Sequence, residues 1–225
     1  MKYFLDTEFL EGFKKPIKWL PTIGRFNKSY HYIQLVSIGI VSEDGREYYA
    51  ISNEFNPKDA NDWVKENVLS KLPTRFLYNA NINPTKLVDT YKSNKQIAEE
   101  IIHFTNPELF LHNMAEPNLE FYAYYADYDW VLFCSLFGTM MDLPKGFPMY
   151  CNDLKQMLDE WVVSETKNFP TRYKYSHTND TFEIKLSHIK GRSSYPKQEN
   201  EHSAIDDAKW NKKLYEFIQE LDHNV

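Results

Sequence analysis

A chain of 225 residues is long enough for one sizeable domain and too short for two comfortable ones. Hydrophobic residues make up 42% of the sequence and aromatic residues 16%, so a packed core is expected and the composition shows little sign of global disorder. The formal net charge of −6 argues against a protein that coats nucleic acid through bulk positive charge, although bound cations can neutralise an acidic site locally.

The cysteine content and the N-terminal residues predict a compartment. Cys134 and Cys151 are the only cysteines, and each lies in an apolar stretch without metal-ligand spacing. Two free, buried thiols fit a reducing cytoplasm better than a disulfide scaffold does. The chain reaches Asp6 too soon after Met1 for a signal-peptide core, and no apolar run approaches the roughly 20 residues of a membrane span. We therefore expect a soluble cytoplasmic protein with no membrane partner.

The N-terminal part of the chain predicts a β-meander. Lys2–Leu5 is expected to form a short strand that ends on the acidic triplet Asp6-Thr7-Glu8. The next strand, Tyr32–Val41, is apolar on both faces, which is typical of a central strand in a covered sheet. A tight-turn signal at 43–45 then leads to an antiparallel strand at Arg46–Ser52. Strict alternation divides the apolar side chains of the central strand between two faces, with Ile33, Leu35 and Val41 on one and Val36, Ile38 and Ile40 on the other.

Helical patterns dominate the rest of the chain. Pro57 introduces the first helical segment, and Ser93-Asn94-Lys95-Gln96 has the form of a capping box at the start of another. Glu120–Ala126 is expected to be an aromatic strand that precedes a helix beginning near Asp129. Asn152 is the expected N-cap of the next helix, and the last helix begins near residue 203. The apolar positions at helical spacing are Val64, Val68, Leu69, Leu72, Ile97, Ile101, Phe104, Leu132, Leu136, Leu154, Met157, Leu158, Trp161, Trp210, Leu214, Phe217 and Leu221.

This order of elements predicts an α/β fold. Three strands in a meander, followed by alternating helices and strands and a C-terminal helix, indicate a mixed central β-sheet flanked by α-helices. No internal repeat or linker divides the chain, so residues 1–225 are expected to form one domain. Residues 13–31, which are basic and aromatic, and residues 164–200, which are polar, are predicted to be insertions or loops.

The acidic triplet is the first candidate site. Asp6 and Glu8 are two residues apart on a predicted strand, so their carboxylates project from the same face. Like charges so close together repel, and a divalent cation between them would relieve the repulsion. A solvated strand end is the alternative interpretation of such a pair.

Two further acidic positions lie at predicted helix starts. Asp129 stands where the aromatic strand meets its helix, as a metal ligand or as a simple N-cap, and Asp127 competes with it for a metal role. His202 precedes the last helix, and Asp207 lies five residues after His202, in the first turns of that helix. A surface histidine and an exposed first-turn acid are the alternatives here. The small residues Ala204 and Ala208 favour a close approach of that turn to the sheet.

Together these motifs resemble a known family. DTEF at 6–9, IQLVSIGIV at 33–41, YADYDWVLFCSLFG at 125–138 and HSAIDDAKWN at 202–211 resemble the DEDDh 3′–5′ exonucleases. They are most similar to the bacterial and phage exoribonuclease group typified by a mycobacterial RNase with an RNase H-like fold. WVKENVLSKLP at 63–73 and FPMYCNDLKQ at 147–156 extend the likeness over nearly the whole chain.

The resemblance implies a fold, a set of site residues and a chemistry. It implies an RNase H-like domain with metal ligands at Asp6, Glu8, Asp129 and Asp207 and a general base at His202. Four carboxylates suit two Mg²⁺ or Mn²⁺ ions, one activating water and the other stabilising the leaving 3′-oxygen. Histidine suits proton abstraction near neutral pH. The expected products are 5′-nucleoside monophosphates.

The substrate is less well defined than the chemistry. Single-stranded RNA is expected from the resemblance, whereas residue chemistry alone does not separate RNA from DNA. The alternatives are a DNA-directed 3′–5′ exonuclease and a non-catalytic nucleic-acid-binding domain, and the presence of all five site residues weakens the second. The basic-aromatic segment 13–31 has the composition of a single-strand platform or of a packed insertion. The sequence leaves a homodimer open.

Overall fold

The computed structural model describes residues 1–17, 19–22, 27–73, 90–105, 119–168 and 186–223. Its strands are β1 (Lys2–Lys14), β2 (Tyr30–Ser42), β3 (Glu47–Ser52), β4 (Tyr91–Lys92), β5 (Glu120–Ala123) and β6 (Asn152–Asp153). Its helices are α1 (Asp62–Asn67), α3 (Asn94–Thr105), α4 (Ala126–Ser135), α5 (Leu154–Asn168) and α7 (Ala204–His223). Short 3₁₀ turns are η1 (Pro57–Asp59), η2 (Leu69–Lys71) and η3 (Met140–Asp142).

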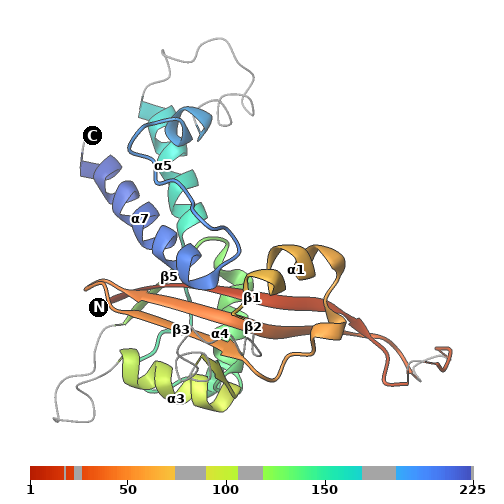
Figure 1. Cartoon of the computed structure of the whole chain (residues 1–225). Coiled ribbons are helices and arrows are strands. Elements are labelled where there is room, and N and C mark those ends of the chain that lie inside the picture. The colour runs from red at the N-terminus through yellow and green to blue at the C-terminus, as the bar shows by residue number, and fades with distance from the viewer. Residues whose placement is uncertain (18, 23–26, 74–89, 106–118, 169–185, 224–225) are drawn as a thin grey trace, which may run out of the picture.

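The six strands form one mixed sheet in the order β4-β3-β2-β1-β5-β6. β1, β2 and β3 are antiparallel neighbours, whereas β5 is parallel to β1, β6 to β5 and β4 to β3. Helices α5, α7 and α1 cover one face, and α3 and α4 cover the other (Figure 1). The predicted α/β class with a mixed sheet between helices is therefore confirmed.

Each face of the sheet has its own core. On the α3/α4 side, Tyr3, Leu5, Ile38 and Ile40 pack with buried residues of both helices. On the other side, Phe4 packs with the apolar residues of α5 and α7, while Leu10 and Val36 pack under α1. Side chains from successive positions of β1 thus enter opposite cores, which is the alternation expected of a strand covered on both faces.

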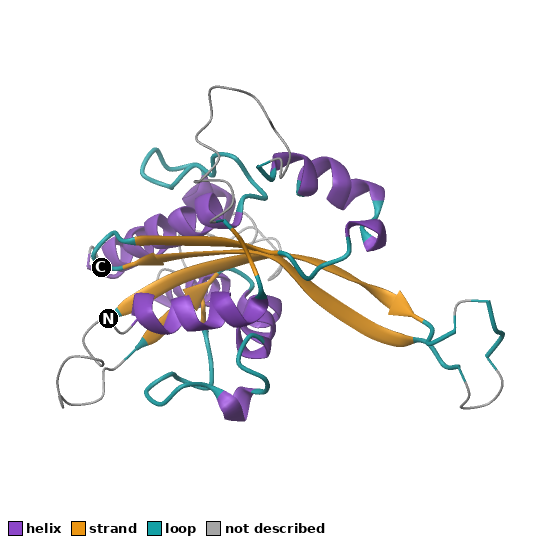
Figure 2. Cartoon of the chain, turned by 60° about the horizontal axis from the view of Figure 1, so that its bottom comes forward, coloured by secondary structure: helices purple, strands orange, loops and turns teal. Residues whose placement is uncertain are grey.

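β1 is much longer than the sequence predicted. It continues through the acidic triplet to Lys14, because its pairing with β2 extends to Lys14 opposite Tyr30. β5 pairs only with the first residues of β1, so the outer half of the β1–β2 pair projects beyond the sheet as a two-stranded arm (Figure 2). The predicted strand end at Leu5 was wrong, and so were the limits of the 13–31 insertion, since residues 13–14 and 30–31 belong to the strands.

A β-bulge changes which residues of β2 face which core. The register shifts between Glu8 and Phe9, where Glu8 lies opposite Ser37 but Phe9 lies opposite Leu35. Leu35 therefore shares a core with Ile38, and Val36 packs on the opposite side. The predicted faces were wrong because one extra residue in a strand inverts the alternation beyond it.

Two helix starts also differ from the prediction. β5 ends at Ala123 and α4 begins at Ala126, so Asp129 lies within the first turn and is not the N-cap. Asn152 belongs to β6, and the cap of α5 is Asp153, whose carboxylate accepts hydrogen bonds from the backbone N–H groups of Lys155 and Gln156. The capping box at Ser93 is confirmed by reciprocal hydrogen bonds between Ser93 and Gln96.

The second predicted insertion is only partly a loop. α5 continues to Asn168, and residues 186–190 are helical, with Leu186 and Ile189 buried against α5 and α7. Residues 169–185 lie outside the described part of the chain. Within the described ranges, no helix combines the length and apolarity that crossing a membrane requires.

Candidate active site

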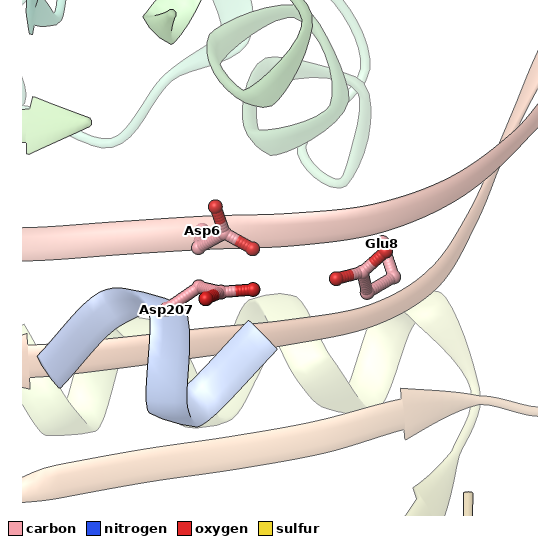
Figure 3. A group of neighbouring side chains, drawn as sticks. All are labelled: Asp6, Glu8 and Asp207. Atoms are coloured by element: carbon pink, nitrogen blue, oxygen red, sulfur yellow. The ribbon is translucent and has the colours of Figure 1, made fainter. Parts of the chain in front are cut away.

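Three acidic side chains meet above the middle of β1. Asp6 and Glu8 project from the same face of the strand, and Asp207 approaches them from the first turn of α7 (Figure 3). One carboxylate oxygen from each of the three lies within 4.8 Å of those of the other two. The structure therefore brings together residues that are some 200 positions apart in the sequence.

Close packing under α7 allows this approach. A Cβ atom added to Gly39, which lies opposite Asp6 on β2, would be 2.3 Å from the carbonyl oxygen of Ala204. Ala204 and Ala208 are fully buried, so the close approach expected from these small residues is confirmed. Further along α7, the side-chain amide of Asn211 donates a 2.8 Å hydrogen bond to the carbonyl of Leu5. Glycine and alanine remove side-chain volume here, and the Asn211 bond ties the helix to the strand.

Asp129 reaches the same strand from the opposite side. Its Oδ1 accepts hydrogen bonds from the backbone N–H of Thr7 at 2.8 Å and from the Thr7 hydroxyl at 2.6 Å. Asp129 is buried and is not among the three carboxylates that meet within 4.8 Å. Thr7 lies between Asp6 and Glu8, so these hydrogen bonds attach Asp129 to the middle residue of the acidic triplet. Asp127, the sequence-based competitor, is exposed on α4.

Asp153 fixes the start of the helix that carries Asp129. Its Oδ2 accepts a 3.0 Å hydrogen bond from the N–H of Ala126, and its Oδ1 accepts those of the first turn of α5. One carboxylate thus caps two helices. Sequence reasoning missed Asp153 because it placed the cap one residue earlier. The available signal was the preference for aspartate at N-caps.

His202 lies beside the carboxylates, in a turn with unusual backbone geometry. Its φ is +64°, a left-handed value that is costly outside glycine and is maintained only by surrounding contacts. Its backbone N–H donates a 2.8 Å hydrogen bond to Oδ2 of Asp207. Its imidazole packs against the indole of Trp63 on α1. The turn therefore holds His202 and Asp207 in a fixed relationship.

Asp207 has further partners that its neighbour Asp206 lacks. The side-chain amide of Gln198 donates a 2.6 Å hydrogen bond to Oδ1 of Asp207. Asp206 instead accepts a hydrogen bond from Asn200 and lies 3.9 Å from the ammonium of Lys209. Of the two adjacent aspartates, the structure therefore directs only Asp207 toward β1.

The acidic groups strongly perturb one another. Burial raises the pKa of Asp6 well above its usual range, and the carboxylates of Asp129, Asp207 and Glu8 raise it further. Burial and the carboxylates of Asp207 and Asp129 raise the pKa of Glu8 to about 8, with Lys71 opposing them. Burial raises the pKa of Asp129 to about 7, although the hydrogen bonds from Thr7 oppose the shift. The pKa of Asp207 is also raised, chiefly by burial.

This arrangement fits a hard divalent cation. Neighbouring, desolvated carboxylates are costly when all are ionised, and Mg²⁺ and Mn²⁺ favour oxygen ligands of this kind. The donors are all oxygens, and no cysteine or histidine side chain belongs to the group of three carboxylates. The cluster can therefore bind a cation that neutralises it.

A groove opens next to the carboxylates. Its volume is about 460 Å³, and Glu8 is both one of its lining residues and a member of the acidic cluster. Residues of β1 form one wall of the groove, and residues 61–68, which include α1, form the other. The remaining lining residues are Phe9, Glu11, Gly12, Phe13, Asn61, Trp63, Val64 and Val68.

Comparison with known proteins shows the family of the chain. Residues 23–219 match the model of the 3′–5′ exoribonuclease Rv2179c-like domain. The chain belongs to this family. Two curated proteins, the 3′–5′ exoribonucleases Rv2179c and MT2234.1 from two strains of Mycobacterium tuberculosis, are each 35% identical to it over 160 residues. These alignments cover 71% of this chain and 75% of each relative. Within this Rv2179c-like chain, the matched range contains Asp129, His202 and Asp207, and Asp6 and Glu8 precede it.

Proposed function

We propose that this member of the family removes nucleotides one at a time from the 3′ end of single-stranded RNA, using two divalent cations. The carboxylate cluster of Asp6, Glu8 and Asp207 carries this proposal, because three buried or half-buried acids within 4.8 Å suit cation-assisted phosphodiester hydrolysis. Membership of an exoribonuclease family supports RNA as the substrate and the 3′ end as the start. Asp129, hydrogen-bonded to Thr7, is the proposed fourth ligand.

Each residue of the site has a separate proposed role. Asp6, Glu8, Asp129 and Asp207 would hold Mg²⁺ or Mn²⁺, which when bound supply charge neutralisation and water activation. His202 would accept the proton of the attacking water, and its contacts with Trp63 and Asp207 hold it beside the cluster. The groove that begins at Glu8 would receive the terminal nucleotide. The products would be 5′-nucleoside monophosphates.

The sheet supports the RNase H-like assignment as well. An antiparallel meander, β3-β2-β1, is extended beyond β1 by the parallel strands β5 and β6, and the acidic pair lies on the central β1. In an open sheet with helices on both faces, a site at the strand where the connections change direction is a common arrangement.

The decisive experiment is the digestion of one oligonucleotide sequence as RNA and as DNA, each labelled at the 5′ or the 3′ end. With Mg²⁺ or Mn²⁺, 5′-labelled RNA is expected to shorten in single-nucleotide steps, and 3′-labelled RNA is expected to release labelled mononucleotide at once. Excess EDTA and the variant Asp6→Ala are expected to abolish both reactions. Full activity in EDTA would contradict the cation mechanism. Faster digestion of DNA would favour a DNA-directed enzyme, and no digestion of either would favour a binding domain.

A further inference from the structure

An exposed stripe of large side chains runs along the helix that carries Asp129. Tyr128 and Val131 are three residues apart on one side of α4, and Tyr125 immediately precedes the helix; their exposed fractions are 45%, 56% and 63%. Large exposed side chains close together in the chain can mark a binding site. Tyr128 stacks on Phe9, and Phe9 lines the same groove as Glu8, so the stripe adjoins the proposed active site.

Two contacts hold the aromatic ring of Tyr128 in a fixed orientation. Its ring stacks on Phe9, with centroids 5.4 Å apart and planes inclined by only 10°. Its hydroxyl donates a 3.1 Å hydrogen bond to Oε1 of Glu11. Phe9 directly follows Glu8 on β1, so the stacked pair joins the stripe to the strand that bears the acidic cluster. A ring restrained in this way loses little further freedom when a base stacks on its open face.

Tyr125 is also held outward by the backbone. Its φ of +58° is left-handed, and it immediately precedes α4. Its ring packs edge-on against Tyr124, with centroids 4.7 Å apart, yet remains the most exposed side chain of the stripe. Sparsely populated backbone conformations of this kind persist where the surroundings enforce them, often at functional positions.

The charges around the stripe favour bases over phosphates. Glu11 accepts a hydrogen bond from Tyr128, and the exposed Asp127 lies between the two tyrosines in the sequence, so carboxylates near the rings would repel a phosphate backbone. Aromatic rings stack on bases of any sequence, as in proteins that bind single strands without sequence preference. A single strand can stack on the rings and avoid the carboxylates if its bases face the rings and its phosphates face solvent.

We propose that Tyr125 and Tyr128 form a stacking platform for the RNA bases on the 5′ side of the bond being cleaved. This inference rests on the proposed function and assigns a path to the part of the strand that remains after each cleavage. The platform would adjoin the groove beside Glu8, because Tyr128 contacts Phe9 and Glu11, which both line that groove.

The test compares two octanucleotides that share the same terminal nucleotide and the same phosphates. One is ordinary RNA, and the other carries abasic riboses upstream of the terminal two nucleotides. For Tyr125→Ala and Tyr128→Ala, kcat/KM on ordinary RNA is expected to fall about tenfold, mainly through KM, and to change less than twofold on the abasic strand. Tyr128→Phe keeps the ring and is expected to retain most of the wild-type kcat/KM on ordinary RNA. The loss is expected to persist at high salt, because stacking releases no counterions.

Tyr30→Ala is the matched comparison, because Tyr30 is similarly exposed but lies at the end of the β1–β2 arm. Unchanged KM in both α4 variants would overturn the platform, as would an equal loss on the abasic strand or a loss confined to Tyr30→Ala. A change in molecular mass by ultracentrifugation in the α4 variants would assign the stripe to contact between two copies and would also overturn it. If wild-type protein digests neither octanucleotide, the proposed function itself fails.

Discussion

The imidazole of His202 packs edge-on against the indole of Trp63, with ring centroids 4.9 Å apart and planes inclined by 77°. The two residues come from segments 139 positions apart, the turn before α7 and the α1 helix. A second contact joins the same turn to η2, which follows α1, since the Lys71 ammonium donates a hydrogen bond to the carbonyl of Glu201. The proposed general base is therefore positioned from the side by the helix that also walls the groove.

The first prediction concerns this contact. Trp63→Ala is expected to lower kcat about tenfold, less than complete loss of a general base, because the imidazole would lose its lateral support. Trp63→Phe keeps an aromatic surface and is expected to retain most of kcat. Affinity for Mn²⁺, measured by titration, is expected to remain unchanged in both. In a His202→Ala background, Trp63→Ala should have no further effect on kcat, and an additive loss would contradict the positioning role.

The second prediction concerns His202 itself. His202→Ala is expected to reduce kcat by roughly 10²–10⁴-fold, the usual contribution of a general base, while Mn²⁺ still binds. His188→Ala serves as the control, because His188 is exposed in the segment at 186–190. A normal rate in His202→Ala would remove this residue from the proposed mechanism.

The third prediction concerns Gly39. Gly39→Ala places a Cβ against the backbone of Ala204, so α7 must shift away from β1 and separate Asp207 from Asp6. We expect a stability loss of about 1–3 kcal/mol by thermal unfolding, together with weaker Mn²⁺ binding. Gly45→Ala is the control: its φ of +89° makes the substitution strained, but open space surrounds it. That variant should lose stability and keep the Mn²⁺ affinity of the folded protein.

The fourth prediction concerns the double cap. Asp153→Ala leaves the first N–H groups of α4 and α5 without their acceptor, at a cost of about 1–3 kcal/mol. Because α4 carries Asp129, we also expect weaker Mn²⁺ binding and lower kcat well below the unfolding temperature. Thr139→Ala removes the cap of η3, whose hydrogen bonds are with Met141 and Asp142 and with none of the site carboxylates, and should affect stability alone. Equal kinetic effects of the two variants would indicate that Asp153 contributes only stability.

The fifth prediction concerns pH in the absence of divalent cations. The folded-state pKa of Glu8 is about 8 against an ordinary 4.5, and that of Asp129 is about 7 against 3.8. The folded protein therefore retains protons that the unfolded chain has already released, so stability is lost as pH rises from about 4 to 8. Tm of the metal-free protein is expected to fall between pH 5 and pH 8. Added Mn²⁺ should raise Tm more at pH 8 than at pH 5, and Glu8→Gln should flatten the metal-free slope.

Several features were predictable because they depend on neighbours in sequence. The hairpin turn, the capping box at Ser93 and the apolar positions of α3, α5 and α7 follow from local propensity and periodicity. The pairing of Asp6 and Glu8 on one face follows from strand geometry alone. Resemblance over short motifs then indicated which distant acids belong with them.

Other features depend on partners that local patterns do not reveal. The length of β1 is set by pairing with β2, and the bulge opposite Glu8 that inverts the faces of β2 depends on that pairing. Asp153 and Trp63 act on groups carried by other segments, so neither has a local signature of its role.

The sequence by itself determined the α/β class and the placement of Asp6 and Glu8 on one face of a strand (Figure 3), because residue types and spacings carry that information. Only the tertiary structure decided that Asp207 meets Asp6 and Glu8, that Asp129 instead binds Thr7, and that Trp63 contacts His202. The reason is physical: these contacts join segments far apart in the chain, and their distances depend on the close packing of α7 over Gly39 and on the caps that fix α4.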